Sequence, residues 1–412
     1  MRLHEERRAS LQGKLTFAPF LLNRHGHVEH RRRISPDGPL ISTELIRSRG
    51  GHREATHMPR IPTDSLSVTP AWLSEVLGAD VYGCELEQIA VGVGLLGTLF
   101  RVHLDGGPDV PASVVIKLPT LDTQVRAAIC EAANFYQKEV RFYEEIGLAN
   151  PLPPARPYFV AFDEATHDFV LVLEDLARLR LADQRFGCSA EDAEAVIDAI
   201  ARHHAHWWDS DHLTSLPWLK TYDVPPFSAV VISNYEAAWP VFLERLGSDV
   251  SPELRDFGDR FRSLMPWFLE ELSRPPLTFL HGDLRLDQLF FGVAPDDPPV
   301  TALDWQITGK GRAAYDVGYF LSQSLTTDTR RSCEDQLLKR YSERLAEHGI
   351  IYPPDQLTRD YRLTTAWCFI YPVIAAGRVD IANDHQLELI RAILNAAATA
   401  IEDHDVMSLR PD

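Results

Sequence analysis

The sequence predicts an α+β fold in two lobes, a small mostly β lobe followed by a larger, mostly helical one. Three observations support this prediction. A length of 412 residues favours two domains over one. Short runs rich in β-branched residues fill the first part of the chain, and from residue 189 onward the pattern is that of helices. We place the lobes at residues 58–176 and 177–412.

Residues 1–57 differ from both lobes in charge. They hold eleven Lys or Arg against six Asp or Glu, a net charge of +5, whereas the whole chain carries −18. They contain no continuous apolar stretch of the kind that a targeting peptide needs. We therefore expect a disordered basic leader, with translation from Met58 as the alternative.

The composition excludes several classes of function. The net charge of −18 argues against a nucleic-acid-binding surface, which needs clustered cations. The apolar run at residues 366–376 is too short to span a membrane and contains Pro372, so we expect a buried helix there. The five cysteines form no CxxC pair, which argues against a zinc site or a disulfide framework and favours the cytoplasm.

Apolar periodicity and capping residues divide each lobe into elements. Thr69 and Pro70 open the first helix of the β lobe. Ser189 with Asp192 resembles a capping box at the start of a long helix that reaches Trp208. Between these helices we expect a strand, glycine turn and strand at 86–104, a strand at 113–118, a helix at 124–146 and a strand at 169–176.

Three glycines in the first turn of the β lobe, Gly92, Gly94 and Gly97, spell GxGxxG. The next element is a strand and not a helix, so a dinucleotide-binding βαβ unit is excluded and a phosphate-covering hairpin remains. A plain tight turn explains the glycines equally well.

Lys117 lies inside the apolar strand SVVIKLP. A lysine on a buried strand is costly unless it meets an anion, although an edge strand would let it reach water. Glu139 lies 22 residues later on the predicted helix, where it could pair with Lys117 and aim the ammonium at phosphates. The alternative for Glu139 is a solvated helix face.

Two acidic residues follow apolar runs in the helical lobe. Asp283 belongs to the stretch HGDLRLDQLFF, which comes after LTFL, and Asp304 comes after VTAL. Because buried charges demand partners, this concentration of charge indicates a site. Asp283 is the candidate for accepting a proton from a substrate hydroxyl. Asp304 is placed to bind Mg²⁺, which prefers carboxylate oxygens.

The neighbours of Asp283 have supporting roles in this interpretation. We expect His281 to orient the loop and not to act as a base. Arg285 and Asp287 form either part of the site or a structural ion pair, and we weigh these alternatives equally. Asp316 is expected to cap the following helix and to brace the loop.

These parts, in this order, resemble the phosphotransferase families that share the protein-kinase-like fold: aminoglycoside phosphotransferases, choline kinases and especially the ecdysteroid-kinase-like (CHK kinase-like) proteins. The strongest motif is HGDLRLDQLFF with ALDWQ, followed by GRAAYDVGYFLSQSL. The glycine turn, Lys117, Glu139 and LVLEDL precede it in the expected order. The resemblance covers residues 65–400 approximately, and an order of five parts is far more specific than any single motif.

The resemblance implies an ATP-dependent small-molecule kinase that uses Mg²⁺. It implies ATP-binding residues along the β lobe: Gly92, Gly94 and Gly97 over the phosphates, Lys117 and Glu139 beside them, and the backbone from Glu174 to Leu176 at adenine. It implies catalytic and metal-binding residues in the helical lobe: Asp283 as the base, accompanied by His281 and Arg285, and Asp304 as the principal Mg²⁺ ligand with Gln288.

Gln288 departs from the family pattern, which ends this loop with Asn. Gln keeps the amide oxygen on a stem one methylene longer, so it can still ligate Mg²⁺ if the loop relaxes by about one ångström. Misplacement of that size can cost about 10²-fold in rate. The departure introduces the alternative of a pseudokinase that binds nucleotide or a small ligand without phosphoryl transfer.

We expect the acceptor to be a hydroxyl of a small molecule. A protein-serine kinase fits less well, since the chain reads HGD for HRD and DWQ for DFG and shows no APE-type segment. An apolar, sterol-like acceptor is favoured because the sequence shows no dense acidic cluster suited to a polyamine sugar. The aromatic residues of the helical lobe form either the wall of the acceptor site or plain core: Trp207, Trp208, Trp239, Trp367, Phe369 and Tyr371.

Overall fold

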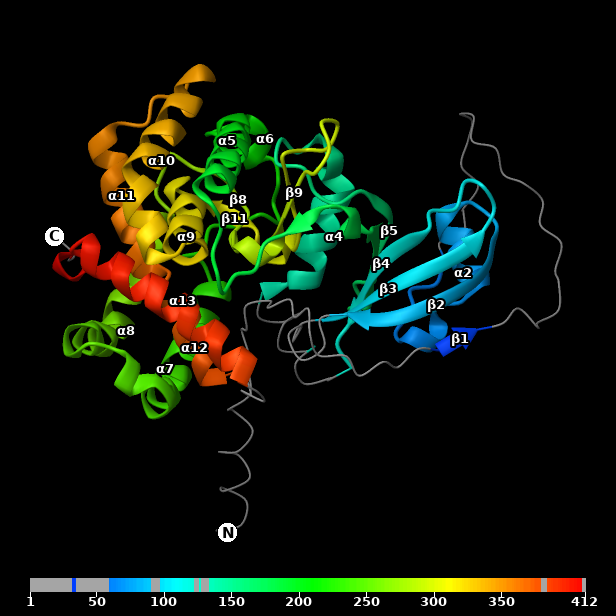
Figure 1. Cartoon of the computed structure of the whole chain (residues 1–412), viewed down its shortest axis with the longest axis horizontal. Coiled ribbons are helices and arrows are strands. Elements are labelled where there is room, and N and C mark those ends of the chain that lie inside the picture. Colours follow the sequence, from blue (N-terminus) through cyan, green and yellow to red (C-terminus); the bar gives the residue numbers. More distant parts are fainter. Residues whose placement is uncertain are drawn as a thin grey trace, which may run out of the picture.

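A computed structural model of the chain shows an antiparallel sheet at one end of the molecule and a group of helices at the other (Figure 1). The structure describes residues 59–89, 97–121, 126, 133–378 and 384–409, together with the backbone of 32–34. The predicted α+β architecture, with the sheet first and the helices second, is confirmed.

The six-stranded sheet has the order β1-β2-β3-β4-β6-β5, and every neighbouring pair is antiparallel. Its strands are β1 (Arg32–Ile34), β2 (Val81–Ile89), β3 (Gly97–Gly106), β4 (Ser113–Pro119), β5 (Pro157–Phe162) and β6 (Phe169–Glu174). β1 comes from the leader and pairs with β2 at the edge of the sheet. Helix α2 (Pro70–Leu77) begins after a Thr69 cap, as predicted, and packs on β2 and β5.

The glycine turn lies between β2 and β3, which pair antiparallel. Gly92 and Gly94 lie outside the described residues, and Gly97 is the first residue of β3. A Cβ at Gly97 would lie 2.9 Å from the carbonyl oxygen of Leu118 on β4, closer than side-chain carbons approach. The close approach of β4 therefore requires a glycine here, independently of what the turn binds.

Helix α4 (Phe135–Glu145) links the sheet to the helical part of the molecule. It contacts β5 and β6 on one side and the turn η6 (Trp305–Ile307) on the other. The ring of Phe142 stacks on Trp305 with a centroid distance of 4.0 Å. The helix ends beside residue 146, as predicted, whereas the predicted beginning at residue 124 lies outside the described residues.

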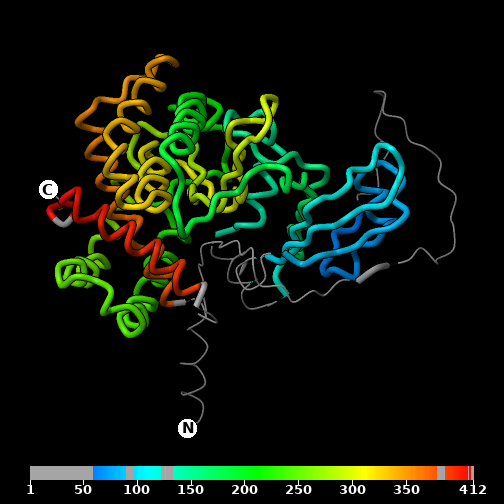
Figure 2. The backbone as a smooth tube through the Cα atoms, viewed as in Figure 1, coloured from blue at the N-terminus to red at the C-terminus, as the bar shows by residue number. Residues whose placement is uncertain are grey.

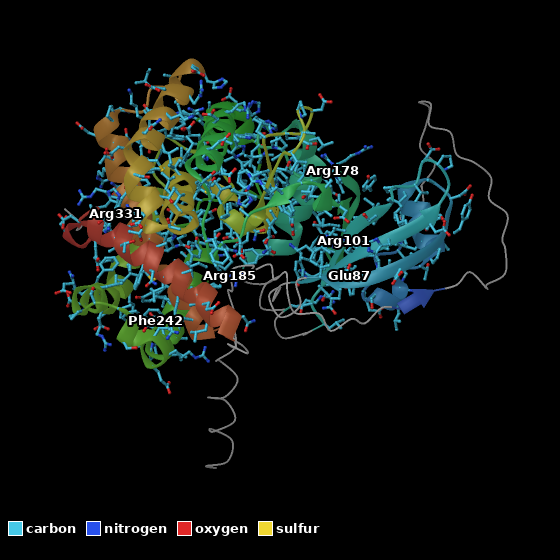
Figure 3. All side chains as sticks on the ribbon, viewed as in Figure 1. Glu87, Arg101, Arg178, Arg185, Phe242 and Arg331 are labelled. Atoms are coloured by element: carbon cyan, nitrogen blue, oxygen red, sulfur yellow. The ribbon has the colours of Figure 1, made fainter. Side chains whose placement is uncertain are left out.

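Two arginines lie near the seam between the sheet and the helical part (Figure 3). Arg101 Nε on β3 donates to Asp175 Oδ2 at 2.8 Å, and Ser113 Oγ on β4 donates to the same oxygen at 2.8 Å. Arg178, in the turn η3 (Leu176–Arg178), pairs with Asp297 of the helical part. Side chains from both parts of the molecule thus converge on the short connection after β6.

Within the described residues, nine α-helices follow the seam: α5 (Ala190–Trp207), α6 (Asp211–Thr214), α7 (Phe227–Leu246), α8 (Pro252–Leu272), α9 (Ala314–Ser324), α10 (Thr327–Glu347), α11 (Pro354–Trp367), α12 (Ile370–Arg378) and α13 (Asp384–Asp403). Ser189 Oγ accepts from Asp192 N–H at 3.1 Å and caps α5, as predicted. The tube in Figure 2 shows α13 running past α12 and α9, both of which it contacts. No described helix combines the length and the apolar character that crossing a membrane requires.

The expectation of a single buried helix at residues 366–376 is wrong, although the run is buried. Helix α11 ends at Trp367 and α12 begins at Ile370. In a continuous helix the N–H of residue 372 would pair with the carbonyl of Cys368, but Pro372 has no N–H. Cys368 O instead accepts from Tyr371 N–H at 3.2 Å and from Gln323 Nε2 at 2.8 Å, so the carbonyl is satisfied at the break.

Short strands carry the two acidic loops that the sequence analysis singled out. β8 (Thr278–Leu280) pairs with β11 (Gly309–Gly311), and β9 (Leu289–Phe291) pairs with β10 (Val300–Ala302) and with β7 (Arg180–Leu181). Residues 281–288 connect β8 to β9, and residues 303–308 connect β10 to β11. Because both loops begin and end on the same two ladders, they lie next to each other.

Candidate active site

The two loops are joined by hydrogen bonds of their own. Leu303 N–H donates to Gln288 O at 2.9 Å, and His281 Nε2 donates to Leu303 O at 2.8 Å. Burial lowers the pKa of His281, so its ring is neutral at pH 7. His281 therefore joins the loops, in line with the orienting role expected for it.

Gly282 separates His281 from Asp283 and has a φ of 85°, in the left-handed region. A Cβ at this position would lie 2.3 Å from the hydroxyl oxygen of Tyr222 and 2.7 Å from Ile307 O. The Tyr222 hydroxyl donates to that same carbonyl at 2.9 Å, so neither atom can easily move away. Both the backbone conformation and the crowding require glycine in the HGD sequence.

Lys117, Glu139 and Asp304 meet from β4, α4 and the loop before η6, and all three are buried. Lys117 Nζ donates to Glu139 Oε2 at 2.6 Å and to Asp304 Oδ1 at 3.1 Å. Strand β4 has a neighbour on each side, so the alternative in which Lys117 reaches water from an edge strand is wrong. Burial alone would lower the pKa of Lys117, but Asp304 and Glu139 raise it above its usual value. The ammonium is therefore charged and fixed in place.

Asp304 directs one carboxylate oxygen to Lys117 and the other to two amides. Oδ2 accepts from Gln288 Nε2 at 3.4 Å and from Gln306 Nε2 at 3.2 Å. Burial raises the pKa of Asp304 to about 7, because Lys117 offsets only part of the cost of burying the charge. Neighbouring carboxylates, Asp283 among them, add to this rise. The ionised form of Asp304 thus calls for more positive charge than Lys117 supplies.

The donors around Asp304 fit a hard divalent cation. Among the described residues no group of three His, Cys, Asp or Glu could hold a metal alone. Mg²⁺ in nucleotide sites, however, takes only one or two protein carboxylates and completes its shell with phosphate and water oxygens. The Gln288 amide can turn its oxygen in place of its nitrogen beside Asp304. Gln306 Oε1 is buried with no partner in the described part of the chain, so a second amide oxygen is available.

Asp283 has one carboxylate oxygen engaged and one free. Oδ1 accepts from Arg285 Nε and from the Tyr319 hydroxyl, each at 2.8 Å. Oδ2 is buried and has no hydrogen-bond partner among the described residues. A carboxylate held in this way can accept a proton from a hydroxyl brought to Oδ2.

Arg285 lies between two carboxylates, those of Asp283 and Asp287. Its Nη1 donates to Asp287 Oδ2 at 3.1 Å, while its Nε contacts Asp283. Arg285 therefore takes part in the ion pair that we weighed and also contacts the candidate base. Burial raises the pKa of Asp287 to about 7 in spite of the opposing charge of Arg285.

The buried cluster holds more acidic than basic groups. Its members are four carboxylates and two cations: Glu139, Asp283, Asp287 and Asp304 with Lys117 and Arg285. Four negative and two positive charges leave −2 when all groups are ionised, and buried charge requires compensation. One divalent cation would balance the cluster.

Asp316 braces the loop but does not cap the helix, so this part of the expectation is wrong. The N-cap of α9 is Ala313, with no side-chain hydrogen bond. Asp316 lies in the first turn and accepts from the backbone N–H groups of His281 at 2.8 Å and Gly282 at 3.0 Å. Burial opposes its charge, but hydrogen bonding from His204 Nε2, at 3.2 Å, and these N–H groups hold the pKa of Asp316 below its usual value.

Two residues of the site, Tyr319 and Gln306, were not predicted from the sequence. Tyr319 lies three residues after Asp316, a spacing that places both side chains on one face of a helix. Gln306 follows Asp304 by two residues in ALDWQ, a polar residue in an otherwise apolar stretch. These spacings were the available signals.

Most of the aromatic residues considered for an acceptor wall belong to the core. Trp207 packs on Phe279 at 5.3 Å, and Trp367 and Phe369 are fully buried among the helices. Tyr371 is different, because its ring stacks on Tyr319, the tyrosine that donates to the candidate base, with a centroid distance of 4.3 Å. It is the member of the set that lies beside the site.

The segment expected to meet adenine, Glu174 to Leu176, lies at the seam. Glu174 ends β6 opposite Val114 on β4, the strand that also carries Lys117. Leu176 opens η3 and is buried. The segment thus lies where the sheet that carries the buried lysine passes into the helical part.

The fold and the site together define a class of protein. An antiparallel sheet with a buried Lys–Glu pair, joined to a helical part that carries two acidic loops, is the arrangement of the protein-kinase-like fold, which phosphotransferases use. More narrowly, the chain belongs to the ecdysteroid kinase-like family, whose model matches residues 92–350. This membership relates it to small-molecule kinases. A search of the curated proteins finds no match.

Solved structures with a similar course of the chain include three phosphotransferases. A protein of Ralstonia eutropha JMP134 that is assigned as an aminoglycoside phosphotransferase is 17% identical to this chain. The match covers 84% of this chain and 99% of that one, with a TM-score of 0.49. Choline kinase of Cryptosporidium parvum Iowa II is 10% identical; the match covers 83% of this chain and 95% of that one, with a TM-score of 0.47. A thermostable mutant of aminoglycoside phosphotransferase APH(4)-Ia, in complex with ADP and hygromycin B, is 15% identical; the match covers 84% of this chain and 100% of that one, with a TM-score of 0.46.

Proposed function

We propose that this protein is an ATP-dependent kinase that transfers the γ-phosphoryl group to a hydroxyl of a small molecule. One observation carries the proposal: the buried Lys117 is bonded to both Glu139 and Asp304, and Asp283 on the adjoining loop has a carboxylate oxygen with no partner among the described residues. Phosphoryl transfer needs this combination of a fixed cation for the phosphates, a carboxylate for metal and a second carboxylate for the hydroxyl proton.

In this proposal residues 58–176 bind the nucleotide. Lys117, fixed by Glu139, contacts the phosphates, and the glycine turn that ends at Gly97 covers them. The backbone from Glu174 to Leu176 meets adenine at the seam. Residues 177–412 supply the two acidic loops and the acceptor site. The four described cysteines are free, which supports the cytoplasm as the location.

Asp283 acts as the base in the transfer step. The acceptor oxygen forms a bond to the γ-phosphorus, the bond from that phosphorus to the ADP oxygen breaks, and the hydroxyl proton passes to Asp283 Oδ2. Arg285 and Tyr319 occupy Oδ1, so Oδ2 is the oxygen open to the proton. Because Oδ2 is buried, the acceptor reaches it only when a neighbouring group moves.

Asp304 and Gln288 would hold Mg²⁺, and Gln306 adds a further amide beside them. Bound Mg²⁺ supplies the positive charge that offsets the phosphate oxygens during transfer. The excess of two carboxylates in the buried cluster supports a divalent ion at this place.

We further propose an acceptor with a largely apolar body. The family takes its name from ecdysteroid kinases. Tyr371 supports this choice, because it is only half-buried and its ring stacks on Tyr319, which contacts Asp283. An aromatic ring face suits an apolar surface.

The experiment is to incubate the full chain with Mg-ATP and a panel of hydroxylated metabolites and to follow ADP release. Asp283→Asn and Asp304→Asn should each lower turnover by at least about 10²-fold, since each removes a group used in the transfer step. Asp328→Asn, an exposed residue in the first turn of α10, is the matched control and should leave turnover unchanged. If Asp283→Asn and Asp304→Asn keep the turnover of Asp328→Asn and of the wild-type protein, the assignment of the two carboxylates is refuted.

The second candidate function is a pseudokinase, which Gln288 in place of Asn favours. Such a protein would show a thermal shift with Mg-ATP that Lys117→Met abolishes, but no ADP release with any acceptor. If the wild-type protein releases ADP faster than Asp283→Asn does, the protein is a kinase and not a pseudokinase.

A further inference from the structure

We infer that Tyr319 is a positioning residue for Asp283: its hydroxyl fixes one carboxylate oxygen so that the other faces the acceptor. The inference rests on the proposed function only in naming Asp283 as the base. Its geometric part, a carboxylate clamped by a tyrosine, stands separately because the Tyr319 hydroxyl donates to Asp283 Oδ1 at 2.8 Å.

A carboxylate on a short stem can rotate, and a base must present one oxygen at a defined place. Asp283 Oδ1 receives two donors, the Tyr319 hydroxyl and Arg285 Nε. Arg285 belongs to the same loop, two residues away, and moves with it. Tyr319 belongs to α9, so it is the donor that fixes the carboxylate relative to the rest of the helical part.

Helix α9 holds the loop at two points. Asp316 and Tyr319 are three residues apart, on one face of the helix. Asp316 accepts from the backbone N–H groups of His281 and Gly282, and Tyr319 donates to the side chain of Asp283. Backbone and side chain of the base segment are therefore anchored to a single rigid element.

Tyr319 is itself held and remains a donor. It is fully buried, and its ring lies parallel to that of Tyr371, with a centroid distance of 4.3 Å and an interplanar angle of 6°. The Tyr371 hydroxyl is bonded to that of Tyr315, which accepts from Trp367 Nε1 at 3.2 Å. Burial, reinforced by the charge of Asp283, raises the pKa of Tyr319 well above its usual value, so the hydroxyl keeps its proton at neutral pH.

The test compares Tyr319→Phe with Tyr235→Phe in the full chain. Tyr235 is the matched control, because its buried hydroxyl also donates at 2.8 Å, to Gly258 O, away from the acidic loops. ADP release from Mg-ATP is measured with water and with the acceptor panel. Tyr319→Phe should lower kcat about 10–10²-fold without changing the KM for ATP, and Tyr235→Phe should change neither.

The split between kcat and the KM for ATP separates positioning from general loss of structure. A misplaced carboxylate slows the transfer step alone, whereas a loosened fold would also weaken ATP binding. Tyr319→Leu, which also lacks the hydroxyl, should lower kcat at least as much as Tyr319→Phe. Identical kcat and KM values for Tyr319→Phe and Tyr235→Phe would overturn the inference.

Crystal structures of the same two variants test whether Tyr319 fixes the Asp283 carboxylate, and this test requires no enzymatic activity. In Tyr319→Phe the Asp283 carboxylate should occupy more than one rotamer, and in Tyr235→Phe it should keep the single position seen here. A single unchanged position in Tyr319→Phe would overturn the inference even if the enzyme is active. Absence of turnover in the wild-type protein would instead remove the proposed function and leave the crystallographic comparison to decide the clamp.

Discussion

The two acidic loops are held in contrasting ways. Asp304 depends on other parts of the chain, since Lys117 reaches it from β4 and Glu139 holds Lys117 from α4. Asp283 is held within the helical part, by its own loop and by Tyr319 on α9. The first arrangement exists only while the sheet and the helical part are in place, whereas the second does not involve the sheet.

This difference separates two functions. Ion pairs that join distant segments fix the position of the sheet relative to the acidic loops, and they are costly when one partner is lost. Hydrogen bonds within one lobe set the orientation of a single carboxylate, and their loss is less costly. We therefore expect separate substitutions to affect nucleotide binding and proton acceptance. The substitutions below run from the largest expected effect on stability to the smallest.

Lys117→Met should have the largest effect on stability. It leaves the carboxylates of Glu139 and Asp304 buried without their cation, which should lower the free energy of unfolding by about 3–5 kcal/mol in urea titrations at pH 7. Lys339→Met, which removes an exposed ion pair with Glu343 on α10, should cost no more than about 1 kcal/mol. Adding Glu139→Leu to Lys117→Met should recover part of the loss; a double variant no more stable than the single one would contradict the pairing.

Asp316→Asn should come next. Asn offers one acceptor oxygen where Asp offers two, so one N–H of the loop backbone loses its partner, at a cost of about 1–3 kcal/mol. Turnover should fall while the thermal shift with Mg-ATP persists, because the ion pairs of Lys117 are intact. Asp163→Asn is the control, since Asp163 also accepts from two backbone N–H groups but lies in an exposed turn. Loss of nucleotide binding in Asp316→Asn would argue against the separation of the two loops.

Lys138→Met should have a smaller effect of opposite sign. Lys138 neighbours Glu139 on α4, is buried, and lies 5.8 Å from the ring centres of Phe135 and Phe227, with no ion pair in the described part of the chain. Burial lowers the pKa of Lys138 from 10.5 to about 8. The substitution should raise the free energy of unfolding at pH 7 by about 1–2 kcal/mol, because the charged amine no longer has to be buried.

The pH dependence of this gain provides the check. Between pH 8 and 10.5 the unfolded chain binds a proton at Lys138 that the folded chain has released, so wild-type stability rises with pH in this window. The advantage of Lys138→Met should shrink accordingly between these pH values. An advantage that is constant with pH would show that packing, and not charge, is responsible.

Gln288→Asn should have the smallest effect on stability, within about 1 kcal/mol, since it exchanges one amide for another. It restores the family residue beside Asp304 and should raise turnover by up to about tenfold if the longer side chain misplaces its oxygen. ADP release from Mg-ATP measures this. Gln323→Asn on α9, where the amide donates to Cys368 O, is a substitution of the same type elsewhere. A fall in turnover would show that the loop has adapted to Gln288.

The sequence predicted those parts of the site whose cost of burial is visible locally. A lysine in an apolar strand demands an anion, and this argument led to Glu139. Tyr319 could not be found in this way, because its hydrogen bond to Asp283 spans 36 residues and depends on how α9 packs. The cap expected of Asp316 failed for a related reason: the loop N–H groups compete for its carboxylate, and the helix begins without a side-chain cap.

The architecture was predictable to a similar extent. Periodicity identified the strands and most helices, since each has one buried face. It did not reveal the break at Cys368, because α11 and α12 are both apolar at that point. Pro372 is no clear signal either, since Pro240 and Pro266 lie inside the continuous helices α7 and α8. Periodicity also could not distinguish aromatic residues of the core from those beside the site. Trp367 and Tyr371 have the same local pattern and differ only in the residues that they contact.

The break between α11 and α12 makes the orientation of α12 adjustable without altering either acidic loop. Successive residues of a helix are turned by roughly 100° about its axis, so one residue inserted after Cys368 would rotate Tyr371 away from Tyr319 by about that angle. A change in the length of this two-residue connection would therefore place another side chain of α12, instead of Tyr371, against the ring of Tyr319.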